Sequence, residues 1–154
     1  MVVIITGTPG TGKTSLASRL AHEENRAVLH VSDVLEQEGL DSEWDAKNQC
    51  FLVDVVALSA VLERHAREDP ELIIDGHLSH EIDPSLVDRC IVCKCELAEL
   101  KRRLEERGYG ESKVRENLDC EIFDVCFTEA LERGHAPEVF WSSEGSFEFI
   151  DEDF

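Results

Sequence analysis

A Gly-rich segment directly behind a short apolar run is the feature that most constrains the fold of this chain. The segment is Gly7-Thr-Pro-Gly-Thr-Gly-Lys-Thr14, and the run Val2-Val3-Ile4-Ile5 precedes it by one residue. It matches the pattern G-x-x-x-x-G-K-[ST] at every fixed position. In that pattern the glycines let backbone N–H groups point at phosphate oxygens, the lysine adds positive charge and the hydroxyl can ligate Mg²⁺. The segment therefore predicts a strand, a phosphate-binding loop and a helix in direct succession, rather than an ordinary Gly-rich turn.

Apolar runs and helical patterns alternate along the rest of the chain. We expect strands at 2–6, 27–31, 72–75, 89–93 and 139–141, helices at 12–24, 33–38, 51–68, 96–107 and 111–133, and an irregular segment at 40–50. This alternation predicts an α/β fold with a five-stranded parallel sheet and helices on both faces. The length of 154 residues favours a single domain over 1–154. Ligands in this architecture bind beyond the carboxyl ends of the strands.

The third expected strand ends at Asp75-Gly76-His77, which should meet the phosphate loop in one crevice. A carboxylate at Asp75 can hold Mg²⁺ opposite Thr14. His77 can orient or deprotonate a water molecule, because the unperturbed pKa of histidine is near neutrality. The plainer alternatives are an aspartate that caps a turn and a loop histidine with a structural hydrogen bond.

Charge is unevenly distributed along the chain. The net charge is −19, yet six of the 15 lysines and arginines lie between Lys101 and Arg115. Within this cluster, Arg103 and Arg107 are four residues apart on one helix face, where they can clamp phosphates or pair with neighbouring glutamates. The acidic remainder repels nucleic acid over most of the surface and attracts basic proteins, although solubility or adaptation to salt explains it equally well.

The six cysteines and the short apolar stretches argue against a zinc-binding protein and against a membrane protein. Cys90, Cys93 and Cys95 lie close together in an expected strand, while the other three are scattered. A zinc site usually needs two separated pairs, so reduced, buried cysteines are favoured over a metal site. The apolar stretches are far shorter than the roughly 20 residues of a membrane span. We expect no membrane contact and no secretion.

Several segments together resemble the adenylate kinase isoenzyme 6 family, also called coilin-interacting nuclear ATPases. This family is an adenylate-kinase-like branch of the P-loop NTPases. The most specific match is Asn117-Leu-Asp-Cys-Glu-Ile-Phe123, which is close to the family's Asn-x-x-Cys-Glu-Ile-Phe. The other matches are Ile5–Thr14, Asp75-x-His77, Arg103–Tyr109 and Gly39–Asp45, and the resemblance spans roughly 1–141.

The resemblance implies ATP and Mg²⁺ as cofactors, a nucleotide-monophosphate-binding region near 32–55 and a short lid near 107–116. It also implies Mg²⁺-dependent ATP hydrolysis with weak adenylate kinase activity, in late maturation of the small ribosomal subunit. The partners would be a basic small-subunit ribosomal protein of the platform and the pre-ribosomal particle. The location would be nucleus and cytoplasm in a eukaryote, and cytoplasm otherwise.

The expected site residues fall into three overlapping groups. Lys13, Asp75 and His77 are the expected catalytic residues, and Thr14 and Asp75 the expected metal ligands. The residues expected to bind ATP are Gly7, Pro9, Gly10, Thr11, Gly12, Lys13, Thr14, Ser15, Arg103 and Arg107.

One position departs from the family and bears on the reaction. The family usually carries an arginine three residues after the aspartate that corresponds to Asp33, and that arginine grips the acceptor monophosphate. Here the position is Glu36, and no lysine or arginine lies between Arg26 and Lys47. We therefore expect transfer to AMP to be weak or absent. A genuine nucleoside-monophosphate kinase and a nucleotide-gated, non-catalytic assembly chaperone remain the alternatives.

Overall fold

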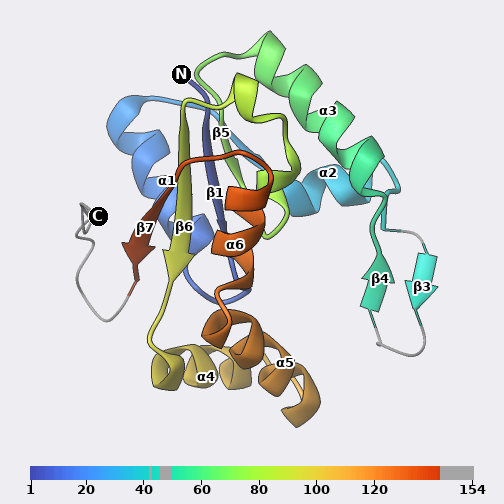
Figure 1. Cartoon of the computed structure of the whole chain (residues 1–154), viewed down its shortest axis with the longest axis vertical. Coiled ribbons are helices and arrows are strands. Elements are labelled where there is room, and N and C mark those ends of the chain that lie inside the picture. The colour runs from blue at the N-terminus through green and yellow to red at the C-terminus, as the bar shows by residue number, and fades with distance from the viewer. Residues whose placement is uncertain (42, 46–49, 143–154) are drawn as a thin grey trace.

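A sheet of five parallel strands forms the centre of the structure, a computed structural model that describes residues 1–41, 43–45 and 50–142 (Figure 1). In space the strands follow the order β2-β5-β1-β6-β7, and each pair is parallel. The strands are β1 (Val3–Gly7), β2 (Val28–His30), β5 (Ile73–Asp75), β6 (Arg89–Lys94) and β7 (Pro137–Trp141). The expected α/β fold is confirmed. The predicted division of 1–154 into one domain with two smaller regions stays a prediction.

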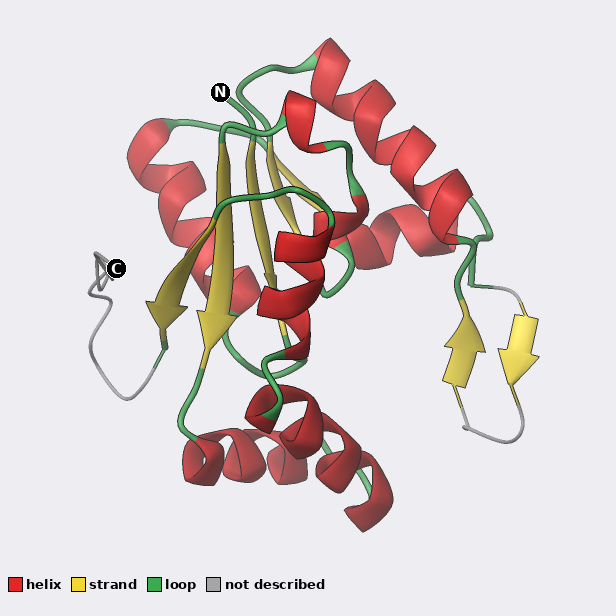
Figure 2. Ribbon diagram, in the orientation of Figure 1, coloured by secondary structure: helices red, strands yellow, loops and turns green. Residues whose placement is uncertain are grey.

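Helices cover both faces of this sheet and also extend beyond its carboxyl ends (Figure 2). The helices are α1 (Lys13–Glu24), α2 (Val31–Gln37), α3 (Val55–Glu68), α4 (Leu97–Glu106), α5 (Glu111–Ile122) and α6 (Val125–Glu132), with 3₁₀ turns η1 (Ser79–Glu81) and η2 (Pro84–Leu86). A separate antiparallel pair is formed by β3 (Glu43–Asp45) and β4 (Cys50–Leu52).

The expectation of an irregular segment over 40–50 followed by a helix from residue 51 is wrong. The two short strands β3 and β4 pair there, and α3 begins only at Val55. The physical reason is the cap at Asp54, whose side chain accepts a hydrogen bond from the Ala57 amide at 3.0 Å. Residues 42 and 46–49, which also belong to the expected irregular segment, lie outside the described residues.

The single helix expected over 111–133 is also wrong, because the chain turns between α5 and α6. Asp124 has a φ of 50°, in the left-handed region that an α-helix cannot pass through. The Lys94 side chain donates to Glu121 at 2.5 Å and also to Asp124, which holds the turn against the end of β6. The apolar spacing continues through the turn, so the pattern alone does not reveal it. As a result α5 packs on α4, while α6 returns to the sheet (Figure 1).

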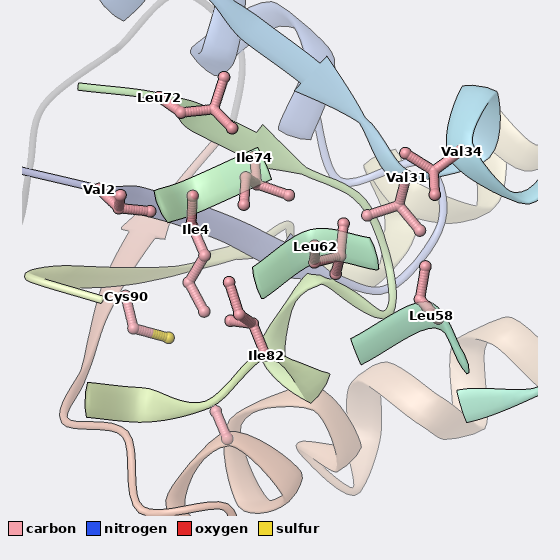
Figure 3. Close-up of a cluster of buried hydrophobic side chains, with 12 residues drawn as sticks. Val2, Ile4, Val31, Val34, Leu58, Leu62, Leu72, Ile74, Ile82 and Cys90 are labelled. Atoms are coloured by element: carbon pink, nitrogen blue, oxygen red, sulfur yellow. The ribbon is translucent and has the colours of Figure 1, made fainter. Parts of the chain in front are cut away.

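The core has two layers, one on each face of the sheet, because the strand residues point alternately to either side. Ile4 and Ile74 pack with α3 residues such as Leu58 and Leu62 on one face (Figure 3). Val3, Ile5 and Ile73 pack with α1 on the other face. Burial of each such side chain contributes about 1.5–3 kcal/mol. These two layers fix the carboxyl ends of β1, β2 and β5 relative to one another, and the candidate site lies there.

Candidate active site

A cavity of about 470 Å³ opens at the carboxyl ends of β1, β2 and β5, a volume typical of small-molecule sites. It is built from the loop after β1 and the start of α1, the end of β2 and the start of α2, the residue after β4, the end of β5 and the loop after it, and one residue at the end of α4. The lining residues are Pro9, Gly10, Gly12, Lys13, Thr14, Ser15, His30, Val31, Ser32, Leu35, Val53, Asp75, Gly76, His77, Leu78 and Arg107. Most of the expected ATP-binding residues are therefore brought together, whereas Gly7, Thr11 and Arg103 lie outside this lining.

The loop after β1 needs glycine at its root and at its end. A Cβ atom on Gly7 would lie 2.6 Å from the carbonyl oxygen of Cys93, because the loop begins in close contact with β6. Gly12, with a φ of 97°, is the N-cap of α1. Thr11 is fully buried, and its hydroxyl donates to the Thr8 carbonyl at 2.7 Å, so this residue shapes the loop from behind. The start of α1 thus opens on the cavity with the positive end of its dipole.

Lys13 folds back along the same loop. Its Nζ donates to the carbonyl oxygens of Gly7 at 2.9 Å and Thr8 at 3.1 Å. Burial lowers the pKa of Lys13 below its usual value. The side chain therefore places a positive charge on the cavity wall within the phosphate loop itself, which is the position that the sequence pattern predicts for it.

Asp75 ends β5 and is almost fully buried, with a partner that the sequence analysis missed. His30 ends β2, the neighbouring strand, and its Nδ1 lies 2.5 Å from Asp75 Oδ1. Both side chains line the cavity. His30 also ends an apolar run, but only the strand order could have shown that β2 and β5 are adjacent. His30 therefore fixes the orientation of the Asp75 carboxylate.

His77 lies beside the first residue of the phosphate loop, and its Nδ1 is 3.2 Å from the Gly7 carbonyl oxygen. A carbonyl oxygen only accepts, so Nδ1 carries the proton and, in the neutral ring, Nε2 keeps its lone pair. Burial and, secondly, the positive charge of Lys13 lower the pKa of His77. The site therefore holds a neutral imidazole with one basic nitrogen, which is the form that a general base needs.

The two arginines expected to clamp phosphates differ in their surroundings. Arg103 donates to the carbonyl of Gly10 at 3.2 Å, to the Ser142 carbonyl at 2.8 Å and to Glu99 at 3.0 Å. These bonds tie α4 to the loop and to the end of β7, and Arg103 is not among the residues that line the cavity. Arg107, at the end of α4, is exposed and lines the cavity. The phosphate contact stays a prediction for both, and the structure brings only Arg107 to the cavity.

The chemistry of the lining fits a nucleoside triphosphate and Mg²⁺. The Thr14 hydroxyl and the Asp75 carboxylate supply hard oxygen donors, which are the ligands that Mg²⁺ prefers. Among the described lining residues, Lys13 and Arg107 carry positive charge, and the charge of Arg107 contributes, after burial, to the lowered pKa of Lys13, so the two lie near each other. Anionic phosphates are therefore favoured beside these two side chains.

The described helices and cysteines outside the cavity bear on two expectations from the sequence. None of the described helices has the length and hydropathy to cross a membrane. Cys90, Cys93 and Cys95 are free and buried in or beside β6, as the sequence predicts.

Comparison with known proteins identifies relatives of this chain. Residues 3–124 match the family model described as an AAA domain. A protein of Methanococcus maripaludis named "Putative adenylate kinase" is 34% identical over 145 residues, which are 91% of this chain and 77% of that protein. One with the same name from Archaeoglobus fulgidus is 42% identical over 141 residues, covering 91% of this chain and 71% of that protein.

The chain is also similar to a eukaryotic protein and to a solved structure. The adenylate kinase isoenzyme 6 homolog of Dictyostelium discoideum is 34% identical over 128 residues, covering 83% of this chain and 73% of that protein. A shikimate kinase structure from Acinetobacter baumannii, in complex with shikimate, has a TM-score of 0.67 at 13% identity, covering 94% of this chain and 84% of that one. The latter likeness shows the fold alone. The chain thus belongs to the family of these archaeal adenylate kinase relatives and the Dictyostelium isoenzyme 6 homolog, and it has their adenylate-kinase-like nucleotide kinase fold.

Proposed function

We propose that this chain is a Mg²⁺-dependent ATPase that transfers the terminal phosphoryl group of ATP mainly to water and only weakly to AMP. The observation that carries the proposal is the state of His77. Its Nδ1–H is committed to the Gly7 carbonyl, which leaves a neutral, basic Nε2 on a side chain that lines the phosphate cavity. A base in this position suits the activation of water.

The roles of the other residues follow from their positions. The loop from Gly7 to Thr14 and the Lys13 ammonium bind the phosphates, and Arg107 approaches them from the end of α4. Thr14 and Asp75 would hold Mg²⁺, which supplies charge neutralisation when it is bound. His30 keeps the Asp75 carboxylate in place. His77 takes the proton of the attacking water.

The opposite end of the cavity supports water as the acceptor. It is lined by Ser32, Leu35 and Val53, and none of these carries a charge. Glu36 is exposed on α2, beside this end of the cavity. Besides Lys13 and Arg107, the described lining offers a phosphate acceptor no lysine or arginine. The lack of an anchor for AMP favours hydrolysis over transfer.

The test compares two products of the same preparation. Phosphate released from ATP alone is measured beside labelled ADP formed from labelled AMP in the presence of ATP, because hydrolysis also turns ATP into ADP, and release should be the faster reaction. Lys13→Met should abolish both, because it removes the loop ammonium, whereas the matched Lys101→Met, on the exposed face of α4, should change neither. AMP phosphorylated much faster than water would instead identify a genuine nucleoside-monophosphate kinase.

We further propose that hydrolysis serves the assembly of the small ribosomal subunit, through a basic ribosomal protein of the platform on the pre-ribosomal particle. The net charge of −19 supports a basic protein partner. The resemblance to the isoenzyme 6 family implies that this partner is the ribosomal protein of the platform. The proposal includes a location in the nucleus and cytoplasm in a eukaryote, and in the cytoplasm otherwise.

Phosphate release should rise several-fold when such a ribosomal protein is added, and an unrelated protein of equal positive charge should give no increase. Tight binding of the ribosomal protein together with negligible turnover of the wild type would point instead to the nucleotide-gated chaperone. A pull-down with Lys13→Met, with and without ATP, separates these two outcomes.

A further inference from the structure

Three polar side chains that have no part in the proposed reaction form a chain of hydrogen bonds in the interior, beside the candidate site. The Thr6 hydroxyl lies 2.8 Å from Nδ1 of His80, and Nε2 of His80 lies 2.8 Å from a carboxylate oxygen of Glu129. Thr6 belongs to β1, His80 to η1 and Glu129 to α6, so the chain joins segments that are far apart in sequence. Thr6 and His80 are fully buried, and neither is among the described residues that line the cavity.

The chain of hydrogen bonds ends on the backbone of the candidate base. The same Thr6 hydroxyl donates to the carbonyl oxygen of His77 at 3.0 Å. Two neighbouring residues also hold this segment on β1, because the Gly76 amide and the Ser79 hydroxyl each donate to the carbonyl oxygen of Ile5 at 3.0 Å. The His77 ring therefore extends from a backbone that is fixed to the strand before the phosphate loop.

The partners of the His80 ring show which of its nitrogens carries the proton. A carboxylate oxygen only accepts, so Nε2 donates to Glu129, and Nδ1 keeps its lone pair in the neutral ring. Burial lowers the pKa of His80 to about 4, which keeps the ring neutral near pH 7. Because Nδ1 is an acceptor, the Thr6 hydroxyl is the donor, and its single hydrogen is shared between this nitrogen and the His77 carbonyl.

Further contacts hold His80 in place. Nε2 of the buried His135 donates to the His80 carbonyl oxygen at 2.9 Å. Glu81, whose carboxylate is paired with Arg133, lies 3.7 Å from Nε2 of His80. The helix that carries Glu129 packs on both β1 and η1. His80 is therefore held through its backbone as well as through both ring nitrogens.

We propose that Thr6, His80 and Glu129 are positioning residues, which hold the backbone of His77 so that its ring stays at the phosphate cavity. Thr6 fixes the His77 carbonyl, and the imidazole of His80 orients the Thr6 hydroxyl. Glu129 fixes the tautomer of that imidazole. The inference rests on the proposed role of His77 as the base and adds residues that act through it.

Two substitutions of Thr6 distinguish positioning from a role in stability alone. Thr6→Val keeps the branched shape and removes the hydroxyl, whereas Thr6→Ser keeps the hydroxyl and removes a buried methyl group. Both should lower the melting temperature. Thr6→Val should also lower kcat for phosphate release by about 10–100-fold, because a small displacement of a reacting group has an effect of that size, and it should leave the KM for ATP unchanged. Thr6→Ser should keep the wild-type kcat, as should the control Ile4→Val, which removes a buried methyl group from the same strand.

The other end of the chain can be tested on a helix surface, where folding is less at risk. Glu129→Ala should lower kcat by about three- to tenfold, because it removes the acceptor for Nε2 of His80. Glu129→Gln should restore most of the lost rate, since its amide oxygen can accept the same hydrogen bond. The matched Glu132→Ala, at an exposed position of the same helix, should behave as the wild type.

Two further measurements separate this inference from the proposed function. Nitrogen NMR of the imidazole rings should find the His80 proton on Nε2 in the wild type, and Glu129→Ala should shift it toward Nδ1, whether or not the protein hydrolyses ATP. In the His77→Asn background, Thr6→Val should cause no further loss of kcat, because residues that act through His77 are not additive with it.

Three outcomes would overturn the inference. They are a His80 proton on Nδ1 in the wild type, an equal loss of kcat in Thr6→Ser and Thr6→Val, and a full additional loss from Thr6→Val in the His77→Asn background. Unchanged hydrolysis in His77→Asn alone would instead overturn the proposed function, and the position of the His80 proton would then report on the hydrogen bonds independently.

Discussion

The two ends of the cavity are built in different ways, although they lie on the same sheet edge. At the phosphate-loop end, Lys13, Asp75 and His77 are each held by a hydrogen bond from or to a fixed neighbour. At the opposite end, the described lining consists of side chains from α2 and the residue that follows β4. The first end is charged and constrained, and the second is uncharged.

This difference indicates which end of the cavity contributes most of the binding free energy of a nucleotide. Charge-assisted bonds to the phosphates are available only at the phosphate-loop end, whereas an acceptor at the other end would gain chiefly from apolar contact. Under the proposed function, the site holds one triphosphate beside a base and does not align two substrates. Substitutions at either end therefore test whether the two ends act independently.

Removal of the base should have the largest effect. His77→Asn is expected to reduce phosphate release from ATP by about 10²–10⁴-fold, because general-base catalysis contributes that much. ATP affinity, measured by calorimetry, should change little. His22→Asn, on the exposed last turn of α1, is the matched control and should behave as the wild type. Unchanged hydrolysis in His77→Asn would remove His77 from the reaction.

The two arginines of α4 should respond differently to the same substitution. Arg107→Ala is expected to weaken ATP binding by about 10–100-fold, since a charged hydrogen bond contributes about 1.5–3 kcal/mol, and to leave the melting temperature unchanged. Arg103→Ala should lower the melting temperature, because it frees the Gly10 and Ser142 carbonyls. Calorimetry and thermal unfolding of both variants test this pair. If both variants lost ATP affinity equally and neither lost stability, both arginines would bind the phosphates, contrary to this prediction.

The two arginines also show which contacts can be predicted from the sequence and which cannot. The spacing of four residues places Arg103 on α4 and Arg107 at its C-terminal cap, but it does not reveal that Ser142, far along the chain, binds Arg103. His30 was missed for the same reason, because its contact with Asp75 depends on the adjacency of β2 and β5. Local patterns predict local elements, and contacts between distant segments appear only once the sheet order is known.

The strands and the phosphate loop were predictable because their signals are local and strong. Buried parallel strands are continuous apolar runs, and the loop needs glycine, lysine and threonine at fixed positions. The break at Asp124 and the start of α3 at Val55 depend instead on a single backbone conformation and a single capping bond. Neither interrupts the apolar periodicity, so neither was visible in it.

A smaller effect is expected from the neighbour of Asp75. His30→Ala should raise the Mg²⁺ concentration needed for half-maximal phosphate release by about tenfold, because it removes the bond that orients a metal ligand. The rate at saturating Mg²⁺ should recover most of the wild-type value. His65→Ala, on α3, is the control. A lower rate that excess Mg²⁺ does not restore would show that His30 acts on the reaction rather than through Asp75.

The smallest effect is expected at the uncharged end. Glu36→Arg replaces an exposed carboxylate on α2 with the guanidinium that the resemblance to the isoenzyme 6 family implies there. It should increase the formation of labelled ADP from labelled AMP by about two- to fivefold, in line with the modest strength of exposed ion pairs. Phosphate release without AMP should not change, because the phosphate-loop end is untouched. A much larger gain would mean that one charge is enough to align an acceptor, and that the cavity is already shaped for two nucleotides. No gain at all would mean that the geometry of this end, and not only its lack of charge, excludes AMP.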